Sequence, residues 1–91
     1  MKRLEASVYG RVQGVSFRYY TQKEAERLNL LGWVANVSDG SVHVIAEGPE
    51  KDLKKLVDYL HTGSPSARVE KVDTTWKTPT NEFRRFSIRW Q

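Results

Sequence analysis

The residues with the clearest chemical potential lie in one short stretch, Gly-Arg-Val-Gln-Gly-Val-Ser-Phe-Arg at positions 10–18. Two glycines four positions apart allow a tight turn in which successive backbone N–H groups point into one concavity, a geometry that binds anions. A helix that starts directly after the turn adds the positive end of its dipole. Arg18 adds a permanent charge and a planar fork of donors that matches two oxygens of a phosphate or carboxylate. This spacing predicts a cup for an oxyanion, formed by Arg18 and by the loop residues Gly10, Arg11, Val12, Gln13, Gly14 and Val15.

The stretch is not one of the common nucleotide-binding patterns. Its glycine spacing differs from the dinucleotide fingerprint, and no Gly-Lys-Ser/Thr follows that would hold a nucleotide and its magnesium. Taken alone, the same residues also fit a glycine-rich turn between a strand and a helix, with a solvated arginine. The rest of the chain has to decide between these two interpretations.

A strand and a helix are predicted on either side of this turn. Residues 3–9 alternate between the two faces of a half-buried strand, whose apolar face carries Leu4, Ala6 and Val8. After a loop at 10–16, helical spacing gives one buried stripe of Phe17, Thr21, Ala25 and Leu28. Asn29 tolerates the left-handed conformation and can end this helix.

Residues 32–47 form the clearest hairpin of the sequence. Asp39-Gly40 is typical of a two-residue type I′ turn between alternating segments. Such a turn pairs Asn36 with His43 and gives an apolar face of Trp33, Ala35, Val37, Val42, Val44 and Ala46. Because strand residues alternate, Asn36 is then expected on the opposite face.

The second half of the chain predicts one more helix and further strands. Gly48-Pro49 opens a helix with Pro49 at its first position, and Gly63 ends it. The apolar stripe of this helix runs through Leu53, Leu56, Val57 and Leu60. In a strand near 67–77 the apolar phase shifts between Val69 and Val72, which indicates a β-bulge. A last strand has Phe86, Ile88 and Trp90 on one face, with Arg85 and Arg89 on the other.

This order, β-α-β-β-α-β, predicts an α+β fold in which two helices cover one face of an antiparallel sheet of four to five strands. The ferredoxin-like split βαβ sandwich satisfies the order and the right-handed crossover rule, and we expect residues 1–91 to form a single domain. The sequence has no cysteine, no apolar stretch long enough to span a membrane and no signal-peptide pattern. We therefore expect a cytoplasmic protein, and its short, partly charged edge strands favour a monomer.

Few catalytic groups other than the cup can be assembled from this sequence. The two histidines, His43 and His61, are isolated, and no His, Asp and Glu cluster has metal-ligand spacing. Ser16 has no predictable base beside it, so a hydrogen-bonding role at the helix start or within the loop is the better interpretation. Asn36 remains: it either satisfies backbone groups near the turn or holds a water or a polar substrate atom next to the cup.

If Asn36 holds water, the cup can support one kind of phosphoryl transfer. This reaction needs mainly positioning and charge stabilisation. A site without a general acid needs a good leaving group, and a carboxylate is one because its acid has a pKa of about 4. The residues therefore indicate hydrolysis of a mixed carboxyl-phosphate anhydride rather than of a phosphate ester.

The chain resembles the acylphosphatases. The resemblance rests on residues 10–18 together with Gly-Trp-Val-Ala-Asn-Val-Ser-Asp-Gly-Ser-Val at 32–42, and it extends to Gly48-Pro49 and to the closing Phe86-Ser87-Ile88. It implies a small cytosolic enzyme that hydrolyses the carboxyl-phosphate bond of acyl phosphates without a metal or an organic cofactor. It also implies that Arg18 binds the phosphate with the loop amides and that Asn36 positions the attacking water. Inorganic phosphate is then the product and a competitive inhibitor.

Two other classes of function fit parts of the sequence. The net charge of +4 favours anionic ligands in general, and the same fold can carry single-stranded RNA on an open sheet face, here with Arg85, Arg89 and Tyr9. Residues 41–45 lack the aromatic pattern of an RNA-recognition strand, however. A module that binds a small anion without turnover has no need of a water-holding Asn36. We therefore expect an acyl phosphate as the substrate, and neither nucleic acid nor membrane as a partner.

Overall fold

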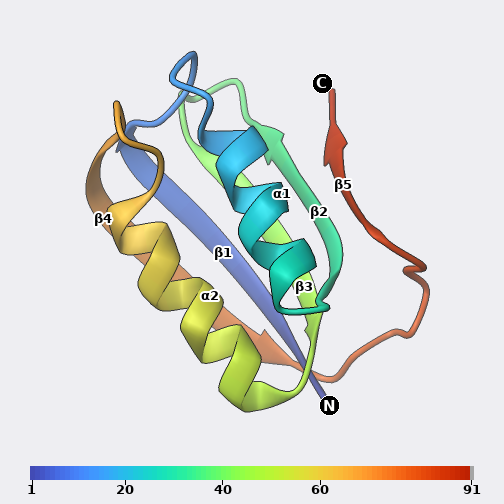
Figure 1. The fold of residues 1–91 in the computed structure, drawn as a ribbon. Helices are drawn as coiled ribbons and strands as arrows, with labels where there is room; N and C mark the ends of the chain where they lie inside the picture. Colours follow the sequence, from blue (N-terminus) through green and yellow to red (C-terminus); the bar gives the residue numbers. More distant parts are fainter. Residues whose placement is uncertain (91) are drawn as a thin grey trace.

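The structure, a computed structural model, describes residues 1–90, which form one five-stranded sheet and two helices. Both helices lie on the same face of the sheet (Figure 1). The strands are ordered β4-β1-β3-β2-β5 across the sheet. In chain order the elements are β1 (Lys2–Arg11), α1 (Phe17–Arg27), β2 (Leu31–Asn36), β3 (Val42–Gly48), α2 (Glu50–Thr62), β4 (Arg68–Lys77) and β5 (Phe86–Arg89).

The predicted α+β fold is confirmed, but the sheet is mixed rather than wholly antiparallel. β5 runs parallel to β2, with Val34 opposite Ile88, whereas every other neighbouring pair among the described strands is antiparallel. These pairings make β4 run opposite to β2. The segment 78–85 crosses the end of the sheet where β4 finishes, so β5 returns in the direction of β2 (Figure 1).

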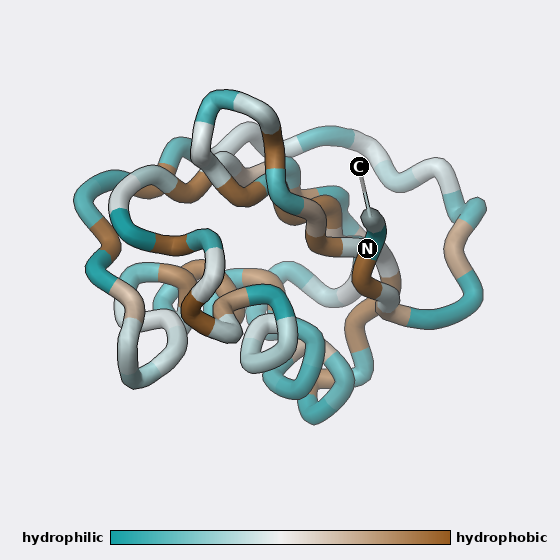
Figure 2. The backbone as a smooth tube through the Cα atoms, turned by 90° about the horizontal axis from the view of Figure 1, so that it is seen from above, coloured by the Kyte–Doolittle hydropathy of each residue, from teal (hydrophilic) through white to brown (hydrophobic). Residues whose placement is uncertain are grey.

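The core lies between the sheet and the helices, as the apolar patterns predict. Figure 2 shows hydrophobic positions gathered between the two layers. From the sheet, Leu4, Val8 and Val44 are fully buried, and they form one cluster with the helix residues Phe17, Ala25, Leu53, Leu56 and Leu60. Burial of these apolar side chains is the main stabilising contribution to such a fold.

The predicted bulge in β4 is confirmed, and it explains why residue 10 is a glycine. Tyr9 lies opposite Lys71 but Gly10 lies opposite Val69, so Glu70 is the extra residue. At Gly10, with φ +126°, an added Cβ would lie 2.2 Å from the carbonyl oxygen of Arg68. Only glycine allows β1 and β4 to approach this closely.

The hairpin register differs from the predicted one by one residue. Asn36 lies opposite Val42, and Ala35 lies opposite His43. The Val37 N–H donates to the Ser41 carbonyl (2.9 Å) and the Gly40 N–H to the Val37 carbonyl (3.0 Å), which defines a three-residue loop with Gly40 at φ +94°. The prediction of a two-residue turn is wrong, because Asp39-Gly40 is compatible with a two-residue and with a three-residue loop.

The one-residue shift exchanges the two faces of β2. Val34 and Asn36 face the helices together with Val42 and Val44, whereas Trp33 and Ala35 lie on the other face. The prediction that Asn36 points away from the core-facing side is therefore wrong. This correction places its side chain under α1 rather than behind the sheet.

The helix ends follow the sequence signals with two differences. Asn29 at φ 58° follows α1 and Gly63 at φ 68° ends α2, as predicted. Pro49 is the N-cap of α2 rather than its first helical residue. Ser16 occupies the N-cap of α1 in a left-handed conformation, and its hydroxyl makes no capping hydrogen bond. The predicted hydrogen-bonding role of Ser16 at the helix start is thus not seen.

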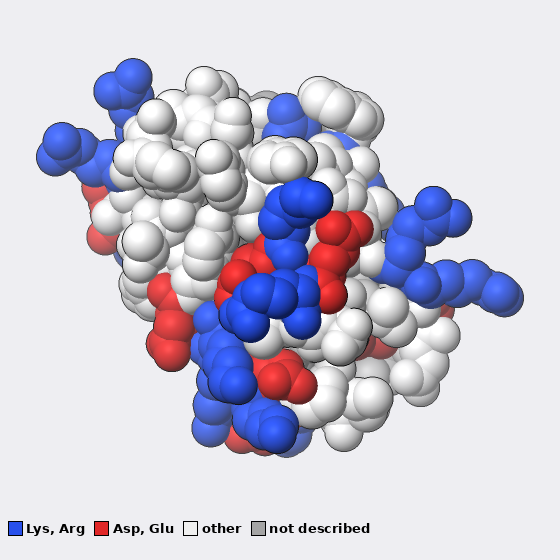
Figure 3. Space-filling model, in the orientation of Figure 1, with Lys and Arg blue, Asp and Glu red and all other residues white. Residues whose placement is uncertain are grey.

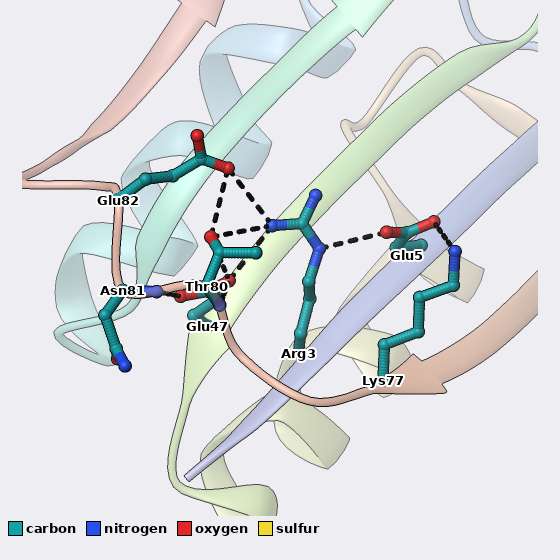
Figure 4. A network of polar contacts seen from close by, with 7 residues as sticks. All are labelled: Arg3, Glu5, Glu47, Lys77, Thr80, Asn81 and Glu82. Carbon is teal, nitrogen blue, oxygen red and sulfur yellow. Dashed lines mark hydrogen bonds and ion pairs between the residues drawn. The ribbon is translucent and has the colours of Figure 1, made fainter.

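A buried carboxylate fastens the segment that leads to β5 (Figure 4). Glu47, whose side chain is 7% exposed, accepts hydrogen bonds from the Thr80 N–H (2.8 Å), the Asn81 N–H (3.0 Å) and the Arg3 guanidinium (3.0 Å). Burial raises the pKa of the Glu47 carboxyl, but these hydrogen bonds outweigh it and hold the pKa below its ordinary value. The ionised carboxylate therefore holds residues 80 and 81 against β3.

The surface shows no single-sign patch on the face that carries the helices. Lys and Arg side chains alternate there with Asp and Glu (Figure 3). No helix among residues 1–90 is both long and apolar enough to cross a membrane.

Candidate active site

The predicted cup is a short loop, residues 12–16, between β1 and α1. Val12 and Phe17 are buried at its two ends and fix it to the core. Between them Gly14 and Ser16 have positive φ values of 74° and 61°. Gly10 and Arg11 belong to β1, where they lie opposite Val69 and Arg68. The observed loop, residues 12–16, is therefore two residues shorter than the predicted loop of residues 10–16.

The backbone donors of this loop are free. Within the described chain, the N–H groups of residues 12–19 donate no hydrogen bond, and the first turn of α1 contains no acidic residue. The Val15 carbonyl oxygen accepts a hydrogen bond from the buried Ser64 hydroxyl (2.7 Å), which ties the loop to the segment after α2. Free N–H groups beside a helix N-terminus are suited to an anion.

The Gln13 side chain connects this loop to the β2–β3 hairpin. Its Nε2 atom donates to the carbonyl oxygens of Val37 (2.7 Å) and Ser41 (2.9 Å). Val37 directly follows Asn36, so the loop and the asparagine are held to each other by this amide. The sequence patterns predicted only a backbone role for Gln13.

Arg18 lies in the first turn of α1 and is held by an aromatic ring. Its guanidinium carbon lies 4.3 Å from the ring centroid of Trp90. Among residues 1–90 no carboxylate lies within ion-pair distance of Arg18. A stacked guanidinium keeps its in-plane donors available for oxygens of a ligand.

Asn36 presents an unused acceptor beside these donors. Its Oδ1 atom is buried and accepts no hydrogen bond from the residues that the structure describes. A buried polar atom without a partner is costly unless a ligand or water satisfies it. Asn36, Arg18 and Gly14 line one cavity of about 300 Å³, together with Tyr19, Ile88 and Trp90.

The loop, the arginine and the asparagine thus meet at one end of the molecule. In Figure 1 the β1–α1 loop, the β2–β3 hairpin and the end of β5 lie together, opposite the N-terminus. The cavity brings free N–H donors, one cation and one orphan amide oxygen together. Such a set can bind a tetrahedral oxyanion and a water molecule next to it.

A model of the acylphosphatase family matches residues 4–88 of this chain. The chain belongs to the acylphosphatase family. An acylphosphatase of Salinibacter ruber (strain DSM 13855 / M31) is 48% identical over 88 residues, which cover 97% of this chain and 93% of the relative. One of Roseiflexus sp. (strain RS-1) is 42% identical over 90 residues, covering 99% and 97% of the two chains. The protein is an enzyme that hydrolyses acyl phosphates to a carboxylate and inorganic phosphate.

Solved structures of the acylphosphatase family have the same fold. The crystal structure of acylphosphatase from Bacillus subtilis matches with a TM-score of 0.94 at 43% identity, and the match covers 98% of this chain and 99% of that one. An acylphosphatase structure from Coxiella burnetii matches with a TM-score of 0.90 at 35% identity, over 97% and 92% of the chains.

The structure brings the main predicted residues of this acylphosphatase-family site together and adds three side chains. Arg18 and Asn36 line the same cavity, whereas His43 lies opposite Ala35 on the other face of the sheet. The additions are Trp90, Tyr19 and the Gln13 amide. The alternation of residues in the last strand predicted that Trp90 and Ile88 share a face. The sequence did not show that this face lies beside Asn36, which follows only from the parallel pairing of β5 with β2.

Groups able to hold a metal do not come together in the part of the chain that the structure describes. No cluster of three or more His, Cys, Asp or Glu side chains is present among residues 1–90.

Proposed function

We propose that the phosphoryl group of the acyl phosphate binds in the loop of residues 12–16, with its oxygens held by the loop N–H groups and by the edge of the Arg18 guanidinium. Asn36 holds a water through its Oδ1 atom on the side of the phosphorus opposite the acyl group. One observation carries this proposal: the buried Oδ1 of Asn36, which has no hydrogen-bond partner among the described residues, lies in the same cavity as Arg18.

The reaction is a single in-line displacement. The water oxygen forms a bond to phosphorus as the bond between phosphorus and the acyl oxygen breaks, and the carboxylate leaves with the electron pair. The proton lost by the water leaves with the phosphate or passes to solvent. Because a carboxylate is stable as an anion at neutral pH, the departing oxygen needs no general acid.

The residues divide the work between charge stabilisation and positioning. The N–H groups of the loop of residues 12–16 and the Arg18 guanidinium stabilise the charge on the equatorial oxygens. Asn36 contributes by orienting the nucleophile, which converts an encounter with bulk water into a reaction within the complex. We propose that no metal ion and no organic cofactor takes part, and that inorganic phosphate competes with substrate for the loop.

Substitution of Arg18 tests this proposal. With benzoyl phosphate as substrate and a chelator in excess, we expect the wild type to remain active and Arg18→Ala to lose at least ~10²–10³ in kcat/KM. Arg18→Lys keeps the charge but loses the fork, and we expect it to be nearly as impaired. Both variants should also lose competitive inhibition by phosphate.

The matched control is Arg84→Ala, which removes an exposed arginine outside the cavity. It should retain wild-type kinetics. Normal hydrolysis by Arg18→Ala would refute the assignment of Arg18, and loss of wild-type activity with the chelator would refute the metal-free mechanism.

A further inference from the structure

The proposed site is built from two pieces of chain that are not joined by strand pairing. The β1–β3 pairing ends at Val8 opposite Val42. Beyond this pair lie the loop of residues 12–16 on one side and, on the other, the β2–β3 hairpin loop that follows Asn36, the last residue of β2. In-line attack requires a defined distance between a phosphate on the first piece and a water on the second, and a misplacement of 1 Å can cost about 10²-fold in rate.

The Gln13 side chain replaces the missing strand pairing between these pieces. Both hydrogens of its amide nitrogen are used, one toward the Val37 carbonyl (2.7 Å) and one toward the Ser41 carbonyl (2.9 Å). The same two carbonyls accept the backbone hydrogen bonds that close the hairpin loop, from the N–H groups of Gly40 and Val37. Gln13 therefore binds the hairpin at the two positions that define its end.

Two hydrogen bonds brace the hairpin loop that follows Asn36. The Asp39 carboxylate accepts hydrogen bonds from the Ser41 N–H (2.9 Å) and the Ser41 hydroxyl (2.6 Å). These bonds lower the pKa of Asp39, so the carboxylate stays ionised and the loop stays braced near neutral pH. Asn36 and Val37 share a peptide unit whose N–H donates to the Ser41 carbonyl, the second acceptor of the Gln13 amide. A displacement of the Ser41 carbonyl therefore displaces this unit and Asn36 with it.

Glutamine is chemically suited to this position. Two carbonyl oxygens require two donors, and a neutral amide supplies them from one nitrogen without placing a charge beside the phosphate. A carboxylate of the same length would repel both carbonyl oxygens, whereas a thioether of similar length would donate to neither. The backbone of Gln13 belongs to the phosphate loop while its side chain grips the hairpin.

We propose that the Gln13 side chain is a positioning residue that sets the distance between the phosphate loop and the water on Asn36. The proposal rests on the function proposed above, because it acts through Asn36. It makes a specific kinetic prediction. Loss of the Gln13 amide should lower kcat, which depends on the water, while phosphate binding by the loop and Arg18 is retained.

Kinetics of Gln13→Met with benzoyl phosphate test this prediction. We expect kcat to fall about 10- to 100-fold, while the inhibition constant of inorganic phosphate changes less than about threefold. The double variant Gln13→Met/Asn36→Ala should be no slower than Asn36→Ala, because residues that act through one group are not additive. Gln22→Met is the matched control: its amide also donates to a carbonyl, that of Phe86, from the middle of α1.

Several outcomes would overturn the proposal. An unchanged kcat, a rise of the phosphate inhibition constant in proportion to the loss of kcat, or additive losses in the double variant each contradict it. Full activity of Asn36→Ala would instead refute the proposed function, whatever Gln13→Met does.

Gln13→Glu keeps the question testable if the methionine variant does not fold. Its protonated carboxyl can donate one of the two hydrogen bonds, whereas the carboxylate can donate neither. The ratio of its kcat to that of the wild type should therefore rise as the pH falls through about 4–5. A ratio that does not change with pH would contradict the positioning role.

Discussion

At the scale of single residues, the unusual feature is an arginine in a proposed anion site that stacks on an indole and, among residues 1–90, pairs with no carboxylate. Arg18 lies over Trp90, which is itself 79% exposed. A carboxylate would compete with the substrate phosphate for the guanidinium donors, whereas the ring occupies only the face of the guanidinium. The stack therefore restrains Arg18 without consuming its hydrogen bonds.

We predict that Trp90→Ala weakens phosphate binding without abolishing turnover. An exposed cation–π contact is worth about 0.5–1 kcal/mol, so the inhibition constant of phosphate should rise roughly two- to fivefold. Trp90→Tyr should restore most of the affinity because it keeps an aromatic face. The measurement is the inhibition constant of phosphate for each variant. Trp76→Ala is the control, because Trp76 lies in β4 and does not line the cavity. Equal affinity in Trp90→Ala and wild type would show that the stack is unimportant.

At the scale of the elements, the sequence predicted which segments form helices and strands but not how the hairpin closes. The alternation of Leu4, Ala6 and Val8 and the stripes of both helices were sufficient because burial depends on the local pattern. Which face of β2 carries Asn36 depends on whether the hairpin loop has two or three residues. Asp-Gly fits a two-residue and a three-residue loop, and only the observed register puts Asn36 on the helix-facing side.

Gly40→Ala tests the geometry of this loop. Gly40 has φ +94°, and a Cβ there would meet no atom within 4 Å, so the cost is one of backbone conformation alone. We predict a loss of about 1 kcal/mol in the free energy of unfolding. Denaturant unfolding measures this loss, and Ser38→Ala in the same exposed loop should be nearly neutral. A Gly40→Ala protein as stable as the wild type would contradict the left-handed backbone at this position.

At the scale of the whole molecule, the two ends of the fold have different tasks. One end carries the cavity, and the other carries the Glu47 network that fastens the segment before β5 (Figure 4). The parallel direction of β5 could not be predicted from the apolar pattern, because residues 78–85 form an irregular crossing held by contacts with Glu47, Arg3 and the Gly32 N–H. That crossing brings Trp90 to Arg18 from the far end of the chain.

The Glu47 carboxylate predicts a pH dependence of stability. Its folded-state pKa is lowered below the unfolded value of about 4.3. Its contribution is therefore fully present above the unfolded pKa and is lost as the pH falls through the folded pKa. Glu47→Gln should be less stable than wild type by about 1–3 kcal/mol at pH 7, and the difference should shrink below about pH 4.

Denaturant unfolding at several pH values checks this prediction. Glu50→Gln is the control, because Glu50 forms an exposed helical ion pair with Lys54 and its loss should change the free energy of unfolding far less than the loss of Glu47. A difference between Glu47→Gln and wild type that stays constant with pH would show that the ionised carboxylate is not what holds the crossing segment.

The central claim is that Asn36 holds the water that attacks the phosphorus, and the kinetics of Asn36→Ala test it most directly. The measurement is kcat for benzoyl phosphate together with the inhibition constant of inorganic phosphate. We predict that kcat falls at least ~10²-fold while phosphate still inhibits at nearly the wild-type concentration, because the loop and Arg18 are intact. A kcat close to that of the wild type would contradict the claim.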